Sequence, residues 1–307
     1  MNKNIALSLE NIDYSINYGF FLKKKEIIKN LSLNVFKGEI FGLVGSNGAG
    51  KTTTIKLGMG LLKPDNGIIK VFGISPEKAG SRKKIGFLTE NQYVYPYLTL
   101  REWLEMLGSI SGIESEKLKF QIKRVVSLVE LDSFLNEKLK NLSKGQVQRA
   151  GIAQALLGKP SILVLDEPMS GLDPLWRHRI KKILKKFNEK GGTIIFSSHI
   201  MSDVLSLSNR IGIIEKGKLK WCGKIKDLDL NKANYQALFY SDDFSKLIQK
   251  DFKFKTLEKQ AGNSWFIEFD SSYKKEFISL ISKHNVCLEY LKPDDLEIEE
   301  MIFGNYF

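Results

Sequence analysis

Short, continuously apolar stretches alternate with helical patterns along roughly the first 220 residues. Such stretches run over residues 40–44, 162–165 and 193–196, and none of them alternates apolar with polar positions. Strands that are buried on both faces carry runs of this kind, whereas strands with one exposed face alternate. The pattern therefore predicts a doubly wound α/β domain built around a parallel sheet.

Two segments depart from this alternation. Residues 99–158 carry only helical patterns, which predicts a helical insert within the α/β domain. Residues 211–214 and 218–221 are joined by Glu215-Lys216-Gly217, a connection typical of a β-hairpin. We expect this hairpin to close a first domain that spans residues 1–223.

The pattern changes after Gly223, where residues 224–307 indicate a second, smaller α+β domain. Its elements follow the order β-α-β-β-α-β, which is that of the ferredoxin-like fold. The expected strands are 235–240, 252–257, 265–269 and 286–291, and the expected helices are 243–249, 272–283 and an amphipathic docking helix at 296–303.

Composition limits the partners without choosing one. The net charge is +12, from 47 Lys and Arg against 35 Asp and Glu, which suits nucleotide phosphate, nucleic acid or an anionic membrane face. The two cysteines, Cys222 and Cys287, give no disulfide framework, so a reducing cytoplasm is the expected compartment. No window approaches the roughly 18 uninterrupted apolar residues of a membrane-spanning helix, so another chain would have to cross any membrane that this one serves.

A glycine-rich loop links the first buried strand to a helix. Residues 45–52 read Gly-Ser-Asn-Gly-Ala-Gly-Lys-Thr, the G-x-x-x-x-G-K-[ST] spacing of a phosphate-binding loop. Glycines let backbone N–H groups approach phosphate oxygens, and the following helix directs its positive end at the same charge. Lys51 would reach the β- and γ-phosphates, and the Thr52 hydroxyl would ligate Mg²⁺. We assign nucleotide contact to Gly45, Ser46, Asn47, Gly48, Ala49, Gly50, Lys51, Thr52 and Thr53.

Two carboxylates, Asp166 and Glu167, end the second buried strand. Ligands of open α/β sheets bind beyond the carboxyl ends of the strands, which is where the glycine-rich loop also begins. Asp166 would hold Mg²⁺, and Glu167 would orient the attacking water. A solvated strand end is the alternative for this pair alone, but the neighbouring loop favours the functional interpretation.

A third motif identifies a family. Leu142-Ser143-Lys144-Gly145-Gln146 precedes a helical segment and resembles the LSGGQ signature of ABC ATPases, with Lys144 in place of the first glycine. The resemblance implies that Ser143, Gly145 and Gln146 bind the γ-phosphate held by the opposite subunit. Taken alone, these five residues are better explained by an N-cap serine followed by a turn glycine.

Other motifs follow in the order of that family, and the resemblance covers residues 5–223. Gln92 resembles the Q-loop glutamine, which implies a contact with Mg²⁺. Ser170-Gly171-Leu172-Asp173 resembles the D-loop, which implies that Asp173 lies at a dimer interface. His199 resembles the switch histidine, which implies a bridge between the γ-phosphate and Glu167, although a purely structural role is the usual one for a lone histidine.

The family also stacks adenine on an aromatic side chain near the N-terminus. The aligned position here is Ile16, which is not aromatic, and Tyr18 lies on the same strand face two residues later. The resemblance therefore implies an adenine contact for Tyr18, with packing in the core as the alternative.

The resemblance implies the fold of a P-loop NTPase and the activity of an ATPase with Glu167, His199 and Lys51 as catalytic residues. Two ATPase subunits, identical or different, would enclose ATP and Mg²⁺ in a head-to-tail dimer. They would power a separate transmembrane permease, with export as the expected direction, from the cytoplasmic side of the membrane. A soluble ABC-type ATPase acting on nucleic acid or the ribosome is the alternative, but those proteins carry two ATPase domains or a long coiled coil, so no nucleic acid partner is expected.

Two groups of residues each have two possible interpretations. Tyr93, Tyr95, Tyr97 and Trp103 follow Gln92, in the region where the family receives its permease, but core packing would explain them equally well. A row of lysines, Lys181, Lys182, Lys185, Lys186 and Lys190, suggests a solvated helix face, with attraction to anionic lipid as the alternative.

Overall fold

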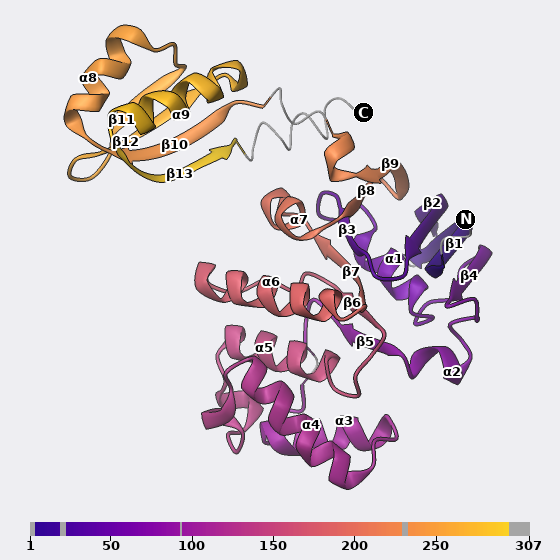
Figure 1. Cartoon of the computed structure of the whole chain (residues 1–307). Coiled ribbons are helices and arrows are strands. Elements are labelled where there is room, and N and C mark those ends of the chain that lie inside the picture. The colour runs from indigo at the N-terminus through magenta and orange to yellow at the C-terminus, as the bar shows by residue number, and fades with distance from the viewer. Residues whose placement is uncertain (1–3, 19–22, 93, 229–232, 295–307) are drawn as a thin grey trace. The chain divides into compact units, whose positions relative to one another are not determined.

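The computed structural model describes residues 4–18, 23–92, 94–228 and 233–294. The chain forms two compact units, Met1–Ile225 and Lys226–Phe307, which are treated separately below (Figure 1). The expected docking helix at 296–303 lies outside the described residues. No helix in the described part of the chain combines the length and the apolar character needed to cross a bilayer.

A six-stranded sheet forms the centre of the first unit. Its strands run in the order β5-β6-β7-β3-β8-β9, and all are parallel except β9, which forms a hairpin with β8. This topology confirms the predicted α/β fold. The bounds are β3 (Ile40–Val44), β5 (Ile85–Leu88), β6 (Ile162–Leu165), β7 (Thr193–Ser198), β8 (Arg210–Glu215) and β9 (Lys218–Lys224).

The strand order determines where the functional loops meet. Strands β6, β7 and β3 are neighbours, and they are parallel, so the residues that follow them gather at one edge of the sheet. The helices that cover the sheet are α1 (Lys51–Gly58), α6 (Pro174–Glu189) and α7 (Met201–Leu207), and the short helix α2 (Ala79–Arg82) precedes β5.

A second sheet, not predicted from the sequence, packs against the first through α1. It is antiparallel, in the order β2-β1-β4, with bounds β1 (Ile5–Tyr18), β2 (Lys23–Phe36) and β4 (Asn66–Val71). Leu9 of β1, Leu43 of β3 and Ile55 of α1 belong to one buried apolar cluster between the two sheets. This core holds the glycine-rich loop between two rigid layers.

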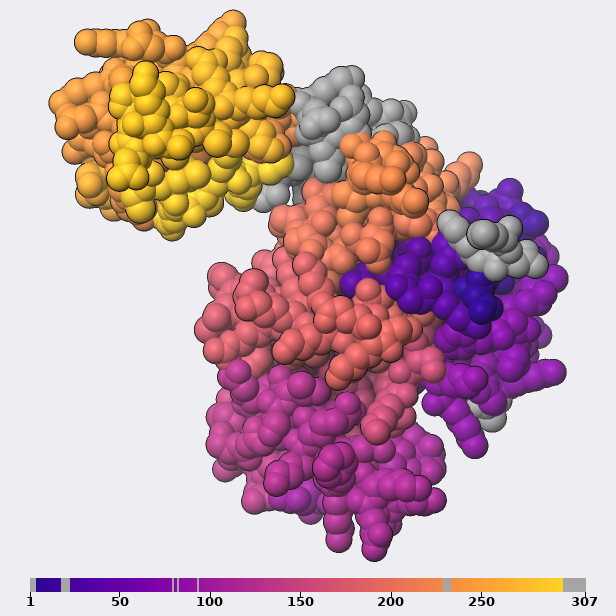
Figure 2. All heavy atoms as spheres, in the orientation of Figure 1, coloured from indigo at the N-terminus to yellow at the C-terminus, as the bar shows by residue number. Residues whose placement is uncertain are grey.

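The segment predicted to be helical forms a lobe of the first unit, shown in magenta in Figure 2. It contains α3 (Leu100–Ile110), α4 (Ser115–Leu128) and α5 (Lys144–Ala155). Trp103 is buried within it, as the core-packing alternative expected, whereas Tyr95 and Tyr97 are 59% and 73% exposed. Tyr93 lies outside the described residues. Helix α5 also packs on β5, so it connects the lobe to the central sheet.

The second unit has the predicted ferredoxin-like topology, with two helices and an antiparallel sheet in the order β11-β12-β10-β13. Its elements are β10 (Tyr235–Tyr240), α8 (Asp242–Asp251), β11 (Thr256–Lys259), β12 (Ser264–Phe269), α9 (Lys274–Lys283) and β13 (Cys287–Pro293). Strand β11 begins four residues later than the expected 252, because Phe252 ends α8 and packs edge-on against Phe269 at a ring-centroid distance of 5.3 Å.

Candidate functional site

The loop after β3 reaches α1 through backbone conformations that require glycine. Gly50 has φ 111°, in the left-handed region, and a Cβ there would also lie 2.8 Å from Cδ1 of Ile28. A Cβ at Gly45 would lie 2.3 Å from the carbonyl oxygen of Ile214. The loop therefore passes close to the neighbouring backbone and delivers the N-terminus of α1 to the edge of the sheet.

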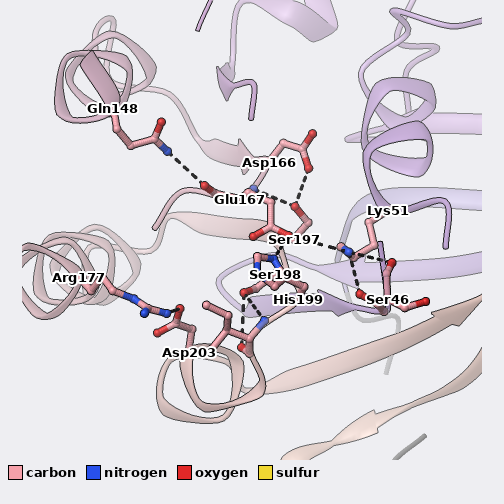
Figure 3. Close-up of polar contacts among 12 residues, drawn as sticks. Ser46, Lys51, Gln148, Asp166, Glu167, Arg177, Ser197, Ser198, His199 and Asp203 are labelled. Atoms are coloured by element: carbon pink, nitrogen blue, oxygen red, sulfur yellow. Dashed lines mark hydrogen bonds and ion pairs between the residues drawn. The ribbon is translucent and has the colours of Figure 1, made fainter. Parts of the chain in front are cut away.

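Lys51, the first residue of α1, points back into this loop. Its side chain is 6% exposed, and Nζ donates to the carbonyl oxygens of Gly45 at 2.7 Å and Ser46 at 3.2 Å (Figure 3). Burial lowers the pKa of Lys51, and the negative charges of Glu167, Asp166 and Glu90 oppose that shift. The ammonium group is thus held at the loop by two carbonyl groups.

The two carboxylates after β6 are held by the next strand. Ser197 of β7 donates its hydroxyl to Oδ1 of Asp166 at 2.6 Å and accepts the backbone N–H of Glu167 at 2.9 Å. From α5, Gln148 donates to the carbonyl oxygens of Glu167 at 3.2 Å and Pro168 at 3.0 Å. Glu167 itself has φ 48°, a left-handed conformation that non-glycine residues adopt at a cost and that clusters at functional sites.

Glu167 lies between a cation and an imidazole. Its Oε1 is 3.9 Å from Nζ of Lys51 and 3.0 Å from Nδ1 of His199, which follows β7. Burial raises the pKa of Glu167, and the hydrogen bond and charge of His199 and the charge of Lys51 pull it down in part. An ionised Glu167 accepts a hydrogen bond from Nδ1–H of His199 in this contact. A carboxylate with a raised pKa is suited to accept a proton from water near neutral pH.

These groups line one open pocket of about 500 Å³. That volume is within the range of small-molecule sites. Its walls are Lys25, Ile27, Asn47, Gly48, Gly50, Lys51, Thr52, Thr53, Glu90, Glu167 and His199. Gly45, Ser46 and Ala49 belong to the same loop but do not line the pocket, and Asp166 lies behind Glu167 with 2% exposure.

Gln92 does not line this pocket, and Glu90 does. The side-chain amide of Gln92 donates to the carbonyl oxygen of Thr89 at 2.5 Å, and its carboxamide lies against Gly151 of α5. The Gln92 side chain therefore points toward α5, the helix that follows the signature motif, and not toward the glycine-rich loop. Glu90, two residues earlier, lines the pocket instead, and its negative charge acts to raise the pKa of Lys51.

The predicted signature and D-loop residues lie outside the pocket of their own chain. Ser143 caps α5, and its hydroxyl accepts the backbone N–H of Gln146 at 3.3 Å, while Oε1 of Gln146 accepts the N–H of Ser143 at 2.7 Å. Gly145 follows in the first turn. Asp173 caps α6 by accepting the N–H of Trp176 at 2.8 Å. Ser143 and Asp173 are both exposed.

The adenine contact predicted for Tyr18 is not addressed by the described residues. Tyr18 ends β1 and pairs with Lys23 across the sheet, but its side chain is outside the described part of the chain. Ile16 is 40% exposed and pairs with Lys25, which lines the pocket. The pocket wall at this end is thus formed by β2, which the sequence analysis did not connect with the site.

Oxygen donors suited to Mg²⁺ stand on two sides of the loop. Thr52 offers a hydroxyl in the pocket, and the carboxylates of Asp166 and Glu90 come from the ends of β6 and β5. Magnesium binds few protein oxygens and completes its shell with phosphates and water. No group of three or more His, Cys, Asp or Glu side chains that could hold a metal ion occurs among the described residues.

Comparisons with known proteins identify the family. Residues 28–170 match the family model described as ABC transporter. An ABC transporter ATP-binding protein of Nostoc is 38% identical over 74% of this chain and 68% of its own length. The linearmycin resistance ATP-binding protein LnrL of Bacillus subtilis is 40% identical over 72% of this chain and 70% of its own length.

Solved structures agree with the sequence matches. A dimeric ATP-binding cassette in a post-hydrolysis state, bound to ADP and Pi, superimposes with a TM-score of 0.66 at 28% identity. The match covers 72% of this chain and 100% of that one. The chain therefore belongs to the ABC transporter family, as an ATP-binding subunit with the activity of an ATPase.

Proposed function

We propose that two ATPase subunits of this type enclose two MgATP molecules head to tail and that hydrolysis drives a separate transmembrane permease. The proposal rests on one observation: the motif residues of this chain fall into two groups, one inside the pocket and one outside it. Lys51, Glu167 and His199 line one pocket, whereas Ser143 and Asp173 are exposed helix caps outside it. A second subunit would bring its own Ser143 to the open side of that pocket.

The loop and α1 would bind the phosphates. Gly48, Gly50, Lys51 and Thr52 line the pocket at the N-terminus of α1, and their backbone N–H groups together with the positive end of the helix would hold the triphosphate. Lys51 would exchange its contacts with the carbonyls of Gly45 and Ser46 for phosphate oxygens. Thr52, Asp166 and Glu90 would hold Mg²⁺, which neutralises developing charge on the phosphate oxygens when bound. Glu90 takes the place that the resemblance assigned to Gln92.

Glu167 would orient the attacking water, and His199 would keep Glu167 in place. The carboxylate sits 3.0 Å from the imidazole and is fixed through its backbone by Ser197 and Gln148. In-line attack requires positioning more than covalent chemistry, because the phosphoryl transition state is loose. From the partner subunit, the Ser143 hydroxyl and the N-terminus of α5 would supply donors to the γ-phosphate.

The lobe would meet the permease. Tyr95 and Tyr97 are large aromatic side chains that are mostly exposed, and amphipathic aromatics of this kind are enriched at protein interfaces. The relative LnrL is named for resistance to linearmycin, which supports export as the direction. The subunit would then lie on the cytoplasmic side of the membrane, bound through the permease.

Two measurements test this function. The purified wild-type chain should hydrolyse ATP only with Mg²⁺, and the Glu167→Gln variant should bind ATP with unchanged affinity but turn it over at least about a thousandfold more slowly. Normal turnover in that variant would reject the role of Glu167. Co-expression with its permease should move the chain into the membrane fraction; if it instead sediments with ribosomes or nucleic acid, the transport proposal is wrong.

A further inference from the structure

Asp203 is a buried carboxylate one helical turn after His199. Its side chain is 4% exposed, and it lies in the first turn of α7. Both of its oxygens are bound by cations from α6: Oδ2 by the guanidinium of Arg177, and Oδ1 by Nζ of Lys181 at 2.8 Å (Figure 3 shows the Arg177 contact). A carboxylate buried this deeply requires such partners, because removing it from water is costly.

Lys181 therefore differs from the other lysines of α6. Its spacing in the sequence predicts a solvated helix face shared with Lys182, Lys185, Lys186 and Lys190. In the structure its side chain is 20% exposed and bound to Asp203. Arg177 and Lys181 are four residues apart on α6, so the two cations project from one face of the helix and hold the carboxylate between them.

The ion triad joins the two helices that begin at motif residues. Helix α6 starts directly after Asp173, whose carbonyl oxygen accepts the N–H of Arg177 at 2.9 Å. Helix α7 starts two residues after His199, and the hydroxyl of Ser198 accepts the N–H of Ile200 at 3.0 Å across that turn. Asp203 thus connects the helix of the D-loop to the helix that follows the switch histidine.

These connections form a closed ring through the active site. His199 contacts Glu167, and the chain from Glu167 passes through the D-loop into α6, with Ser170 N–H donating to the Glu167 carbonyl at 3.1 Å. Asp203 then closes the ring from α6 to α7. Val204 and Leu207 pack α7 on the central sheet, and Asp203 adds the polar contact that joins α7 to α6. This contact matters for a helix of only seven residues with no side-chain cap, which follows a His199 side chain that is 46% exposed.

We propose that Asp203 is a positioning residue for ATP hydrolysis, holding α7 on α6 through Arg177 and Lys181 so that His199 stays within hydrogen-bond distance of Glu167. It does not line the nucleotide pocket, so it acts through His199 and not on the substrate. The inference rests on the proposed roles of Glu167 and His199. It also links the geometry of His199 to the D-loop, which is predicted to lie at the dimer interface.

A double-mutant cycle on the full chain tests this role. Asp203→Asn should lower kcat at least about tenfold and leave KM for MgATP within about twofold, because nucleotide contacts are intact but His199 is misplaced. In a His199→Ala background, Asp203→Asn should lower kcat by less than about a further twofold, because the imidazole that Asp203 positions is already absent. Glu130→Gln is the matched control: it removes the exposed Glu130–Arg179 pair of α6 and should leave kcat within about twofold.

The outcomes separate this inference from the proposed function. An Asp203→Asn kcat within about twofold of wild type, or an equal loss in both backgrounds, would overturn the positioning role while leaving Glu167 and His199 untouched. Full activity in His199→Ala would refute the role of His199 and this inference with it. If Asp203→Asn does not fold, Arg177→Gln replaces it under the same criteria, because Lys181 then still neutralises the carboxylate.

Discussion

At the scale of single residues, the site combines buried charge with a strained backbone. Glu167 holds φ 48° and is 8% exposed, beside a lysine that is 6% exposed. Neither group would be stable there without specific partners, and those partners are backbone carbonyls, Ser197 and His199. The strained backbone and the buried charges cost folding free energy, which the rest of the fold offsets. Such costly features cluster at functional sites.

The raised pKa of Glu167 predicts how Glu167→Gln changes stability with pH. Burial raises the pKa above its ordinary value of 4.5, so between that value and the folded pKa the native protein holds a proton that the unfolded chain has lost. Wild-type stability therefore falls as pH rises through this window. We expect Glu167→Gln to match the wild type at low pH and to be more stable at neutral pH.

Chemical denaturation without nucleotide, from about pH 4 to about pH 8, measures this difference in the free energy of unfolding. Glu130→Gln, which neutralises an exposed carboxylate outside the pocket lining, is the control for the loss of one negative charge. A Glu167→Gln variant that loses stability relative to wild type as pH rises would contradict the burial argument.

The sequence revealed those site residues that belong to contiguous motifs. Lys51 begins α1, and Asp166, Glu167 and His199 come directly after strands β6 and β7, so pattern and motif agree on their position. Ser197 and Gln148 were not found, because a single polar residue within an apolar strand or helix does not reveal its partner. Glu90 was not considered in the sequence analysis, yet it lines the pocket and Gln92 does not, because residues two apart point in different directions in a loop.

At the scale of elements, the main sheet and the ferredoxin-like order could be predicted, but the second sheet could not. The apolar runs of β3, β6 and β7 lie within single segments. Strands β1, β2 and β4 instead depend on pairing between segments far apart in the chain, and β2 begins with exposed lysines that conceal its alternation. Pairing between strands that are distant in the chain cannot be predicted from the local pattern of a single sequence.

Strand β5 packs on α5, the helix that begins in the signature motif, and this contact leaves no room for a side chain at Gly86. A Cβ there would lie 1.9 Å from the carbonyl oxygen of Ala155 and 2.7 Å from a methyl group of Leu163. We expect Gly86→Ala to cost about 2 kcal/mol or more of folding free energy, because backbone must move. Gly80→Ala, with no atom within 4 Å of its Cβ, should change stability by less than about 0.5 kcal/mol. Equal unfolding midpoints for the two variants would refute this packing.

At the scale of the molecule, each unit has its own core, and we propose that they unfold independently. Phe277 is fully buried among Phe239, Phe244, Phe252 and Phe269 of the second unit. Phe277→Ala should remove about 3–5 kcal/mol from the stability of this unit while ATP affinity stays unchanged. Calorimetry and nucleotide titration measure the two effects.

The neighbouring change Ile278→Ala, at a side chain that is 45% exposed, is the control and should change the stability of the unit very little. A loss of ATP binding in Phe277→Ala that accompanies the loss of stability would show that the two units are coupled.

The central claim is that nucleotide bound at residues 45–53 of one subunit is enclosed by Ser143 of another. Sedimentation of the Glu167→Gln variant measures this most directly. With MgATP it should sediment as a dimer that retains two nucleotides, without MgATP as a monomer, and adding Ser143→Arg should keep it monomeric while each chain still binds ATP. A monomer that holds ATP in every case, or a dimer that is indifferent to Ser143→Arg, would contradict the claim.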